Sequence, residues 1–269
     1  MKYCRFLLNG RPHYGAVEDR EGELWIAGNA PIPPEDLAFR LAHVLEAGLE
    51  FSLKPIPLSA AELLPPVTPS KIICVGRNYR DHAKELGNEI PAEPLLFFKP
   101  PSSLLAPGGI VRMPAASTRV DFEGELALVI SRRVTKLDPE DWRSAIRGYT
   151  LANDVTARDL QKKDGQWTRA KGFDTFCPVG PFVSDELDPA AGLTLETRVN
   201  GDLRQHGSTL DFLFGIPALL AYITSAITLE PGDLVLTGTP SGVGPLNAGD
   251  LVEITIPGLG TLANTFAAE

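Results

Sequence analysis

The sequence predicts a β-rich α+β fold, because short apolar runs alternate with turn residues along most of its length. The 25 glycines and 24 prolines are scattered rather than periodic, as expected of many turns between short strands. Helical patterns are confined to a few short segments. Such strand runs, interrupted by turns and by only a few helices, favour an α+β domain.

Residues 1–65 are predicted to form a small N-terminal α/β domain. Residues 2–10 and 13–19 resemble two strands around a turn, and residues 33–48 resemble a short helix that begins at two prolines and ends at a glycine. Residues 63–71 carry three prolines, which is typical of a linker. The second domain is therefore expected to cover residues 70–269.

Strand patterns dominate this second domain. We expect strands over residues 71–76, 94–99, 125–130, 148–154, 178–183, 195–201, 233–239, 250–256 and 260–266. Helices are expected over residues 79–86, 138–146 and 214–227.

Charge and composition exclude several classes of protein. The net charge of -9 leaves no basic footprint for nucleic acid and no attraction to anionic membranes. Three cysteines lie far apart in the sequence, so we expect neither disulfides nor a zinc site, and we interpret Cys177 as a core residue. The longest apolar region, residues 212–227, is too short to cross a bilayer and is interrupted by glycine and proline. We expect a cytoplasmic protein.

Two glutamates form the most distinctive local pattern. Glu123 and Glu125 precede an apolar run, and residues two apart on a strand point to the same face. Carboxylates so close repel each other, and a bound cation relieves this repulsion; oxygen ligands suit Mg²⁺, Mn²⁺ or Ca²⁺. Asp154, at the end of another predicted strand, offers a third ligand. Asp121 continues the alternation and could replace either glutamate, and a solvated strand face is the simpler alternative.

A histidine and a glutamate share one face of the short helix predicted at residues 79–86. His82 and Glu85 are three residues apart, Asn78 can cap the helix, and Gly87 can end it. A carboxylate beside an imidazole fixes its tautomer, and such a pair can activate water as a general base. The helix could be a lid that orders when substrate arrives. The alternative is an ordinary surface pair.

Basic residues that could hold an anionic substrate lie in two places. One is Lys99, and the other is the segment of residues 158–171, which carries Arg158, Lys162, Lys163, Arg169 and Lys171. Solvated loop lysines are the alternative for Lys162 and Lys163. The glycine-rich residues 237–245, which include Thr239, could bind an anion through backbone N–H groups, or could form a purely structural turn.

The order of these motifs resembles that of the fumarylacetoacetate hydrolase family. The matching segments are GRNYRDHAKE, FFKP, EGELALVI, NDVTARDLQ, WTRAKGFDTFCPVGP and LTGTPSGVG, and the likeness runs from about residue 71 to residue 266. The resemblance implies a mixed β-sandwich roll with a small N-terminal domain, and assembly as a homodimer.

The resemblance also implies roles for individual residues. Glu123, Glu125 and Asp154 match the family's metal ligands, usually occupied by Mg²⁺ or Mn²⁺, and this favours them over Asp121. The other matches are His82 and Glu85 to a lid pair that activates water, Lys171 to a lysine that polarises the substrate carbonyl, and Arg158 and Gln161 to polar groups near the substrate. Arg77, residues 164–167 and residues 174–177 are expected to line the far end of the pocket.

By the same resemblance, the substrate is a small anionic 2-oxo acid. Our first expectation is hydrolysis of an acylpyruvate-like 1,3-diketo acid, in which a water activated by His82 attacks the distal carbonyl. The alternatives are oxaloacetate decarboxylation and isomerisation of 2-hydroxyhepta-2,4-diene-1,7-dioate from aromatic catabolism, neither of which needs an attacking water. A non-catalytic binding protein on the same fold is a remote alternative.

Overall fold

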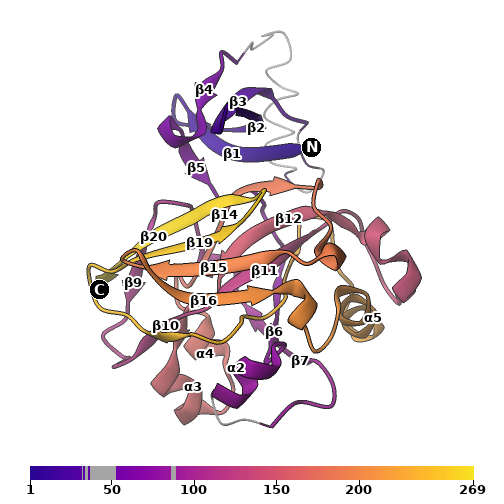
Figure 1. Ribbon diagram of the computed structural model, residues 1–269, viewed down its shortest axis with the longest axis vertical. Helices are drawn as coiled ribbons and strands as arrows, with labels where there is room; N and C mark the ends of the chain where they lie inside the picture. The colour runs from indigo at the N-terminus through magenta and orange to yellow at the C-terminus, as the bar shows by residue number, and fades with distance from the viewer. Residues whose placement is uncertain (32, 34–35, 37–52, 86–88) are drawn as a thin grey trace.

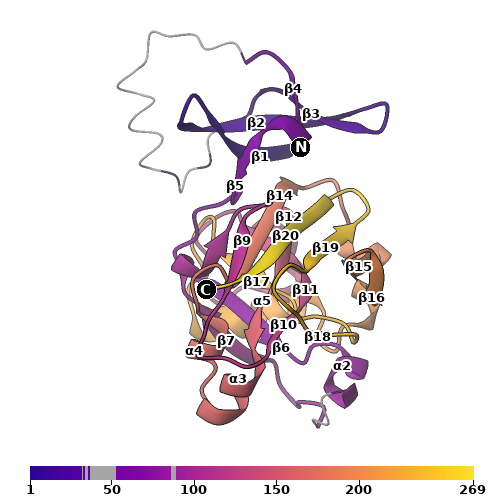
Figure 2. The same cartoon turned by 90° about the vertical axis from the view of Figure 1, so that its left-hand side faces the viewer.

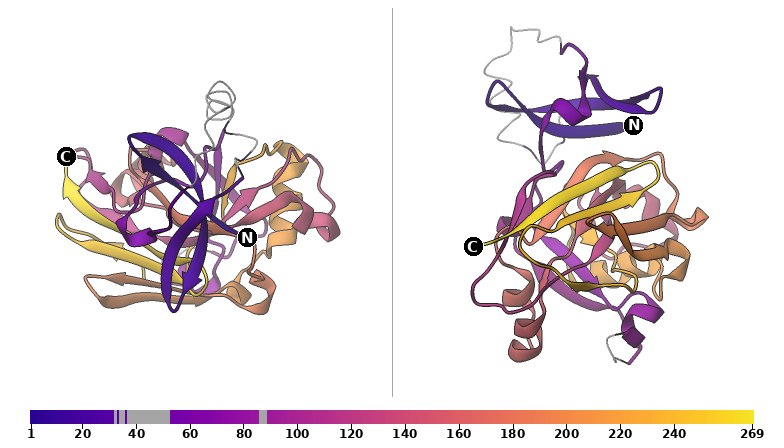
Figure 3. Two further views of the ribbon diagram at one scale, coloured as in Figure 1. Left: turned by 90° about the horizontal axis from the view of Figure 1, so that it is seen from above. Right: turned by 60° about the vertical axis from the view of Figure 1, so that its left-hand side comes forward.

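The structure is a computed structural model that describes residues 1–31, 33, 36, 53–85 and 89–269 (Figure 1). The helix expected over residues 33–48 and the helix end expected at Gly87 lie outside these residues. The described part of the N-terminal region consists of strands and one short 3-10 helix. Its strands β1 (Lys2–Leu8), β2 (Arg11–Arg20) and β3 (Glu23–Asn29) lie at one end of the molecule, opposite helices α2 (Arg80–Glu85) and α3 (Arg158–Asp164) (Figures 2 and 3).

The largest sheet has twelve strands and passes through the whole molecule. Its order is β4 (Ile56–Pro57), β3 (Glu23–Asn29), β2 (Arg11–Arg20), β1 (Lys2–Leu8), β14 (Cys177–Ser184), β12 (Ile146–Asn153), β11 (Gly124–Ile130), β17 (Leu234–Leu236), β6 (Ile72–Gly76) and β7 (Leu95–Lys99). Two strands lie off this path, β5 (Glu62–Leu64) beside β1 and β8 (Leu104–Leu105) beside β14. The N-terminal strands thus join the larger domain's sheet through the pairing of β1 with β14.

A five-stranded sheet covers β11 and β12, as Figure 1 shows. Its order is β16 (Asp202–Ser208), β15 (Thr194–Val199), β19 (Leu251–Ile256), β20 (Gly260–Ala268) and β9 (Ile110–Met113). Every residue of β11 is buried, whereas buried and half-buried residues alternate along β15 and β19. The cover on both faces explains why β11 is a nearly continuous apolar run, while the outer strands alternate.

A third, small sheet carries the approach to the two glutamates. It consists of β13 (Thr156–Ala157), β10 (Val120–Phe122) and β18 (Gly244–Pro245). Its central strand, β10, ends one residue before Glu123, and β11 begins one residue after it. The chain therefore passes from one sheet to another at this glutamate.

The expectation of a β-rich α+β fold is confirmed, and each strand expected after residue 70 overlaps an observed one. The helix expected over residues 214–227 is α5 (Ile216–Ala226), whereas residues 138–146 form a 3-10 helix, Pro139–Ala145. Helices α3 and α4 (Thr168–Lys171) were not predicted, because their largely polar sequences offer no apolar stripe. Among the described residues, no helix combines the length and the apolar character needed to cross a bilayer.

Candidate functional site

The pairing of β11 with β12 brings the acidic residues together. Gly124 lies opposite Asn153, so the residue that follows β12, Asp154, lies beside Glu123, and its backbone N–H donates to the Glu123 carbonyl at 2.8 Å. The Asn153 side chain accepts the Glu123 N–H at 2.9 Å. A Cβ at Gly124 would lie 2.3 Å from Thr197 Oγ1, so only glycine fits between the two glutamates beneath the five-stranded sheet.

Glu123, Glu125 and Asp154 are buried, and each offers a carboxylate oxygen within 4.8 Å of the other two. This spacing is close enough for the three carboxylates to converge on one divalent ion. Oxygen donors alone also match the preference of hard divalent cations. The three carboxylates can therefore hold a divalent metal.

Two lysines and an arginine surround the triad. Lys171 Nζ donates to Glu123 Oε2 at 2.7 Å and to Asp154 Oδ2 at 2.6 Å. Arg158 Nη2 donates to Glu123 Oε1 at 2.5 Å, and Lys99 Nζ donates to Asp154 Oδ1 at 2.7 Å. A carboxylate oxygen has two lone pairs, so one such bond leaves room for a metal on the same oxygen.

Glu125 differs from its two neighbours because it contacts no basic side chain in the part of the chain that the structure describes. Its Oε2 accepts one backbone N–H, from Gly238, at 2.6 Å. Burial raises the pKa of Glu125 well above its ordinary value, and the nearby Asp154 and Glu123 raise it further. Burial also opposes ionisation of Glu123, but Lys171, Arg158 and His82 outweigh it and hold the pKa of Glu123 below its ordinary value. A cation at the triad would supply Glu125 with the partner it lacks.

The lysine stays charged despite its burial. Burial lowers the pKa of Lys171, but Asp154 and Glu123 outweigh this effect and raise that pKa above its ordinary value. Lys171 therefore supplies a fixed positive charge beside the triad, rather than a neutral amine.

His82 lies on α2 and lines the same pocket as the triad. Burial lowers the pKa of His82 below its ordinary value of 6.5, although Glu123 and Glu85 act in the opposite direction. Its ring is therefore neutral at neutral pH, as a general base requires.

Glu85, the expected partner of His82, does not line the pocket. It accepts the backbone N–H of Gly242 at 3.0 Å and so joins α2 to the glycine-rich loop of residues 237–245.

The pocket has a volume of about 260 Å³ and brings together most of the residues expected from the sequence. Its wall contains Val75, Gly76, Arg77, His82, Phe97, Arg119, Glu123, Glu125, Asp154, Arg158, Gln161, Lys162, Trp167, Lys171 and Thr239. Arg77 has a φ of 56°, a conformation that a side chain of this size adopts at a cost and that often occurs at functional sites.

Lys99 requires a correction. We expected it to bind substrate, but it is absent from the pocket wall, and its ammonium lies between Asp154 and the Val155 carbonyl. It neutralises Asp154 from the side away from the pocket.

The Thr239 side chain was also expected to bind substrate, but its hydroxyl contacts protein groups. It donates to the Gly124 carbonyl at 2.8 Å and accepts from Gln205 Nε2 at 2.7 Å, and so helps to hold the loop in place.

Two further interpretations from the sequence were wrong. Asp121, the alternative metal ligand, instead accepts hydrogen bonds from Arg119 and Arg158. The second is Asn78, whose side chain was expected to cap α2. Its side chain donates to the Phe214 and Thr237 carbonyls and accepts the Phe214 N–H, which ties the start of α2 to the α5 region.

The sequence reasoning did not single out Arg119 and Phe97, whereas Trp167 lies in a segment that was expected at the far end of the pocket. Phe97 and Trp167 make an edge-on contact with ring centroids 5.2 Å apart, and Lys171 Nζ lies 4.9 Å from the Phe97 ring centroid. Arg119 lies two residues before Asp121, so the alternation that revealed the glutamates could have pointed to it.

Residues 71–267 match the family model of the fumarylacetoacetate (FAA) hydrolase C-terminal domain. The chain belongs to the fumarylacetoacetate hydrolase family. Residues 1–66 match a second model, described as Rv2993c-like, N-terminal. The family resemblance inferred from the sequence is thus confirmed, and with it the β-rich fold of this family.

Three similar proteins bear on the function of this family member. Protein Rv2993c of Mycobacterium tuberculosis is 47% identical over 89% of this chain and 91% of its own length. Oxaloacetate tautomerase YisK of Bacillus subtilis is 45% identical over 77% of this chain and 73% of its own length. The crystal structure of 2-hydroxyhepta-2,4-diene-1,7-dioate isomerase from Mycobacterium marinum has 39% identity and a TM-score of 0.85, covering 100% of this chain and 99% of that one. The chain is an enzyme of this family.

Proposed function

We propose that this family member is a divalent-metal-dependent enzyme that moves a proton at carbon 3 of small 2-oxo acids, with oxaloacetate as its best candidate substrate. One observation carries the proposal. A neutral histidine, a charged lysine and three metal-binding carboxylates line one pocket. The name of the tautomerase from Bacillus subtilis supports oxaloacetate as the substrate.

The metal, Mg²⁺ or Mn²⁺ held by Glu123, Glu125 and Asp154, would supply a Lewis acid for the 2-oxo carboxylate end of the substrate. His82 accepts the proton from carbon 3, and the electron pair of that C–H bond forms the double bond between carbons 2 and 3. The ammonium of Lys171 stabilises the negative charge that develops on the oxygen of carbon 2. Transfer of the proton from His82, directly or through solvent, to this oxygen gives the enol and returns His82 to its neutral form. The reverse sequence restores the keto acid.

The two ring nitrogens of His82 have different tasks in this scheme. Nδ1 lies 3.3 Å from Glu85 Oε2, which favours the tautomer with its proton on Nδ1. Nε2 has no protein partner within the described residues and is left to accept the substrate proton. The aromatic rings of Phe97 and Trp167 contact each other and form an apolar part of the pocket wall.

The second candidate is hydrolysis of an acylpyruvate, our first expectation from the sequence. The pair of His82 and Glu85 favours it, because the same base could deprotonate a water that attacks the distal carbonyl. The bond between carbons 3 and 4 would then break, and its electron pair would remain on the enolate of pyruvate. Isomerisation of a hydroxydienedioate, supported by the name of the Mycobacterium marinum enzyme, uses proton transfer alone.

A substrate panel with the Mg²⁺-loaded protein separates these candidates. Tautomerisation removes the ultraviolet absorbance of enol-oxaloacetate without releasing pyruvate, whereas decarboxylation releases pyruvate and CO₂. Hydrolysis releases pyruvate and a second acid from an acylpyruvate. We expect the first result. Metal binding without turnover of any of these acids would overturn the proposal and favour a non-catalytic binding protein.

Homodimerisation and a cytoplasmic location belong to the same proposal, since both rest on the family resemblance and on composition. Light scattering of the purified protein at several concentrations tests the dimer. A mass of one chain, 29.0 kDa, at all of them would contradict it.

A further inference from the structure

Arg119 is held rigidly at the wall of the pocket. Its Nε donates to Asp121 Oδ1 at 2.8 Å and its Nη2 to Asp121 Oδ2 at 3.0 Å. Such a bidentate pair fixes the plane of the guanidinium. The Asp121 carboxylate is fully buried, whereas the Arg119 side chain is 46% exposed. Within the described residues Nη1 has no protein partner, so the arginine presents an unused donor edge.

The neighbouring arginine has no such freedom. Arg158 Nε donates to Asp121 at 3.0 Å, Nη1 to Gln161 at 2.8 Å and Nη2 to Glu123 at 2.5 Å. All three of its nitrogens thus already serve protein acceptors, and its side chain is buried. Of the two arginines that hold Asp121, Arg119 is therefore the one that combines an unused nitrogen with an exposed side chain.

The pocket wall carries charges of both signs. The carboxylates of the triad line it together with Arg119. Asp121, which holds Arg119, lies two residues before Glu123, or roughly 7 Å along an extended chain. Arg77 and Lys162 add further positive charge to the same wall. A substrate whose 2-oxo acid end reaches the metal ligands would thus share its pocket with three cationic side chains that could bind its other end.

We propose that Arg119 is a specificity-determining residue that binds the distal carboxylate of a 2-oxo dicarboxylic acid. The placement of the 2-oxo acid end rests on the proposed function, whereas the recognition of the distal end rests on the geometry of Arg119 and Asp121. Asp121 is then a positioning residue, because it orients the guanidinium without reaching the substrate. A purely structural Arg119, which only neutralises the buried Asp121, is the opposing interpretation.

Binding of a matched pair of 2-oxo acids that undergo no net reaction tests this inference. 2-Oxoglutarate and 2-oxopentanoate have the same chain length and the same 2-oxo acid end, but only the first has a distal carboxylate. Each would be titrated calorimetrically into the Mg²⁺-loaded full-length protein. The variants are Arg119→Gln and Arg119→Lys. The control is Arg133→Gln, which removes the same charge from a side chain that is 73% exposed and paired with Glu230.

We expect the wild type and Arg133→Gln to bind the diacid about tenfold or more tightly than the monoacid, as one bond between two charged groups allows. Arg119→Gln should abolish this preference and leave the affinity for 2-oxopentanoate within about twofold. Arg119→Lys keeps a positive charge beside the Asp121 carboxylate, so this variant should retain the stability of the fold. Its single ammonium is occupied by that carboxylate, so it should also lose most of the preference.

Three results would overturn the inference. The wild type could bind both acids equally well, an Arg119 variant could retain the full preference for the diacid, or Arg119→Gln could weaken both acids by the same factor. The last result would assign the arginine a structural role. If the proposed function is wrong, the result differs from these three, because neither acid then binds the Mg²⁺-loaded protein. That result would overturn both the proposed function and the role of Arg119.

Discussion

Nδ1 of His82 lies 3.3 Å from Oε2 of Glu85 on the short helix α2. The same carboxylate accepts the backbone N–H of Gly242, so one side chain orients the candidate base and also fastens its helix to the loop of residues 237–245. A six-residue helix is too short to be stable alone, so this attachment helps to hold the base in place.

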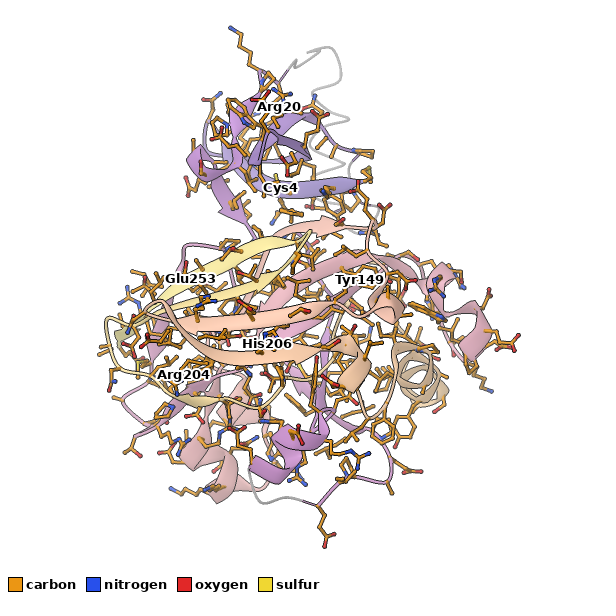
Figure 4. The ribbon with its side chains drawn as sticks, in the orientation of Figure 1. Cys4, Arg20, Tyr149, Arg204, His206 and Glu253 are labelled. Atoms are coloured by element: carbon orange, nitrogen blue, oxygen red, sulfur yellow. The ribbon has the colours of Figure 1, made fainter. Side chains whose placement is uncertain are left out.

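Replacement of the base should affect catalysis more than metal binding. We expect His82→Ala to lower kcat by about 10²- to 10⁴-fold, the usual contribution of a general base. Mg²⁺ affinity should change little, because the carboxylates of the triad remain. Calorimetry with Mg²⁺ and an oxaloacetate assay measure the two effects. The control is His206→Ala on β16, since His206 is 63% exposed on the outer sheet (Figure 4). Full activity of His82→Ala would remove His82 from the mechanism.

The pH dependence of kcat should show the acid limb of a histidine with a low pKa. Burial lowers the pKa of His82 below 6.5, and a nearby divalent cation would lower it further because it disfavours the imidazolium. Only the neutral ring can accept a proton, so activity should fall as the pH falls through this pKa, and the midpoint should lie below 6.5. A midpoint above 7 in a kcat profile would show that another group titrates.

The loop that contacts Glu85 should tolerate no side chain at position 242. Gly242 has a φ of 102°, and a Cβ there would lie 1.9 Å from the Arg204 carbonyl oxygen, so the backbone of the loop must shift. We expect Gly242→Ala to lower the free energy of unfolding by about 3 kcal/mol or more. It should also lower kcat, because the N–H that holds Glu85 moves.

Gly10→Ala is the matched control for that experiment. Gly10 also has a positive φ, 75°, but a Cβ there meets nothing within 4 Å. Its cost should be about 1–2 kcal/mol, that of the left-handed backbone alone. Denaturant titration measures the free energy of unfolding of both variants. If the two substitutions lower it equally, the close contact at position 242 is relieved by a small shift that costs little.

The two glutamates of the triad should respond in opposite ways to neutralisation in the metal-free protein. Glu125 contacts no basic side chain among the described residues, so Glu125→Gln removes a repulsive charge and should raise the free energy of unfolding by about 1 kcal/mol. Glu123 is paired with Lys171 and Arg158, so Glu123→Gln takes one anionic partner from each of these buried cations. Asp154 and Asp121 still pair with them, so the free energy of unfolding should fall by about 2 kcal/mol.

Both variants should lose Mg²⁺ binding, which separates the metal site from stability. Thermal unfolding with and without Mg²⁺ measures the two properties together, because a bound ion stabilises only the protein that binds it. A Glu125→Gln protein that is still stabilised by Mg²⁺ as strongly as the wild type would exclude Glu125 as a ligand.

Local pattern was sufficient to find the strands and the two glutamates, because the period of two places Glu123 and Glu125 on one face without any knowledge of the fold. It was not sufficient for α3, whose largely polar residues show no apolar stripe and whose Arg158 is bound by Asp121 and Glu123, far away in the sequence. Lys99 illustrates the same limit. Its charge suggested substrate binding, but only the structure shows that its ammonium lies behind Asp154.

The sequence by itself determined the strand-rich fold, the family and the chemical nature of the candidate site, since each of these depends on residue types at short spacings. Only the tertiary structure decided which acids converge and which cations face the pocket. Asp121 and Glu123 are equivalent in the alternating pattern, yet two arginines bind the first, and the second lies beside Asp154 where β11 pairs with β12. Contacts between residues far apart in the chain depend on strand pairing, and no local pattern encodes them.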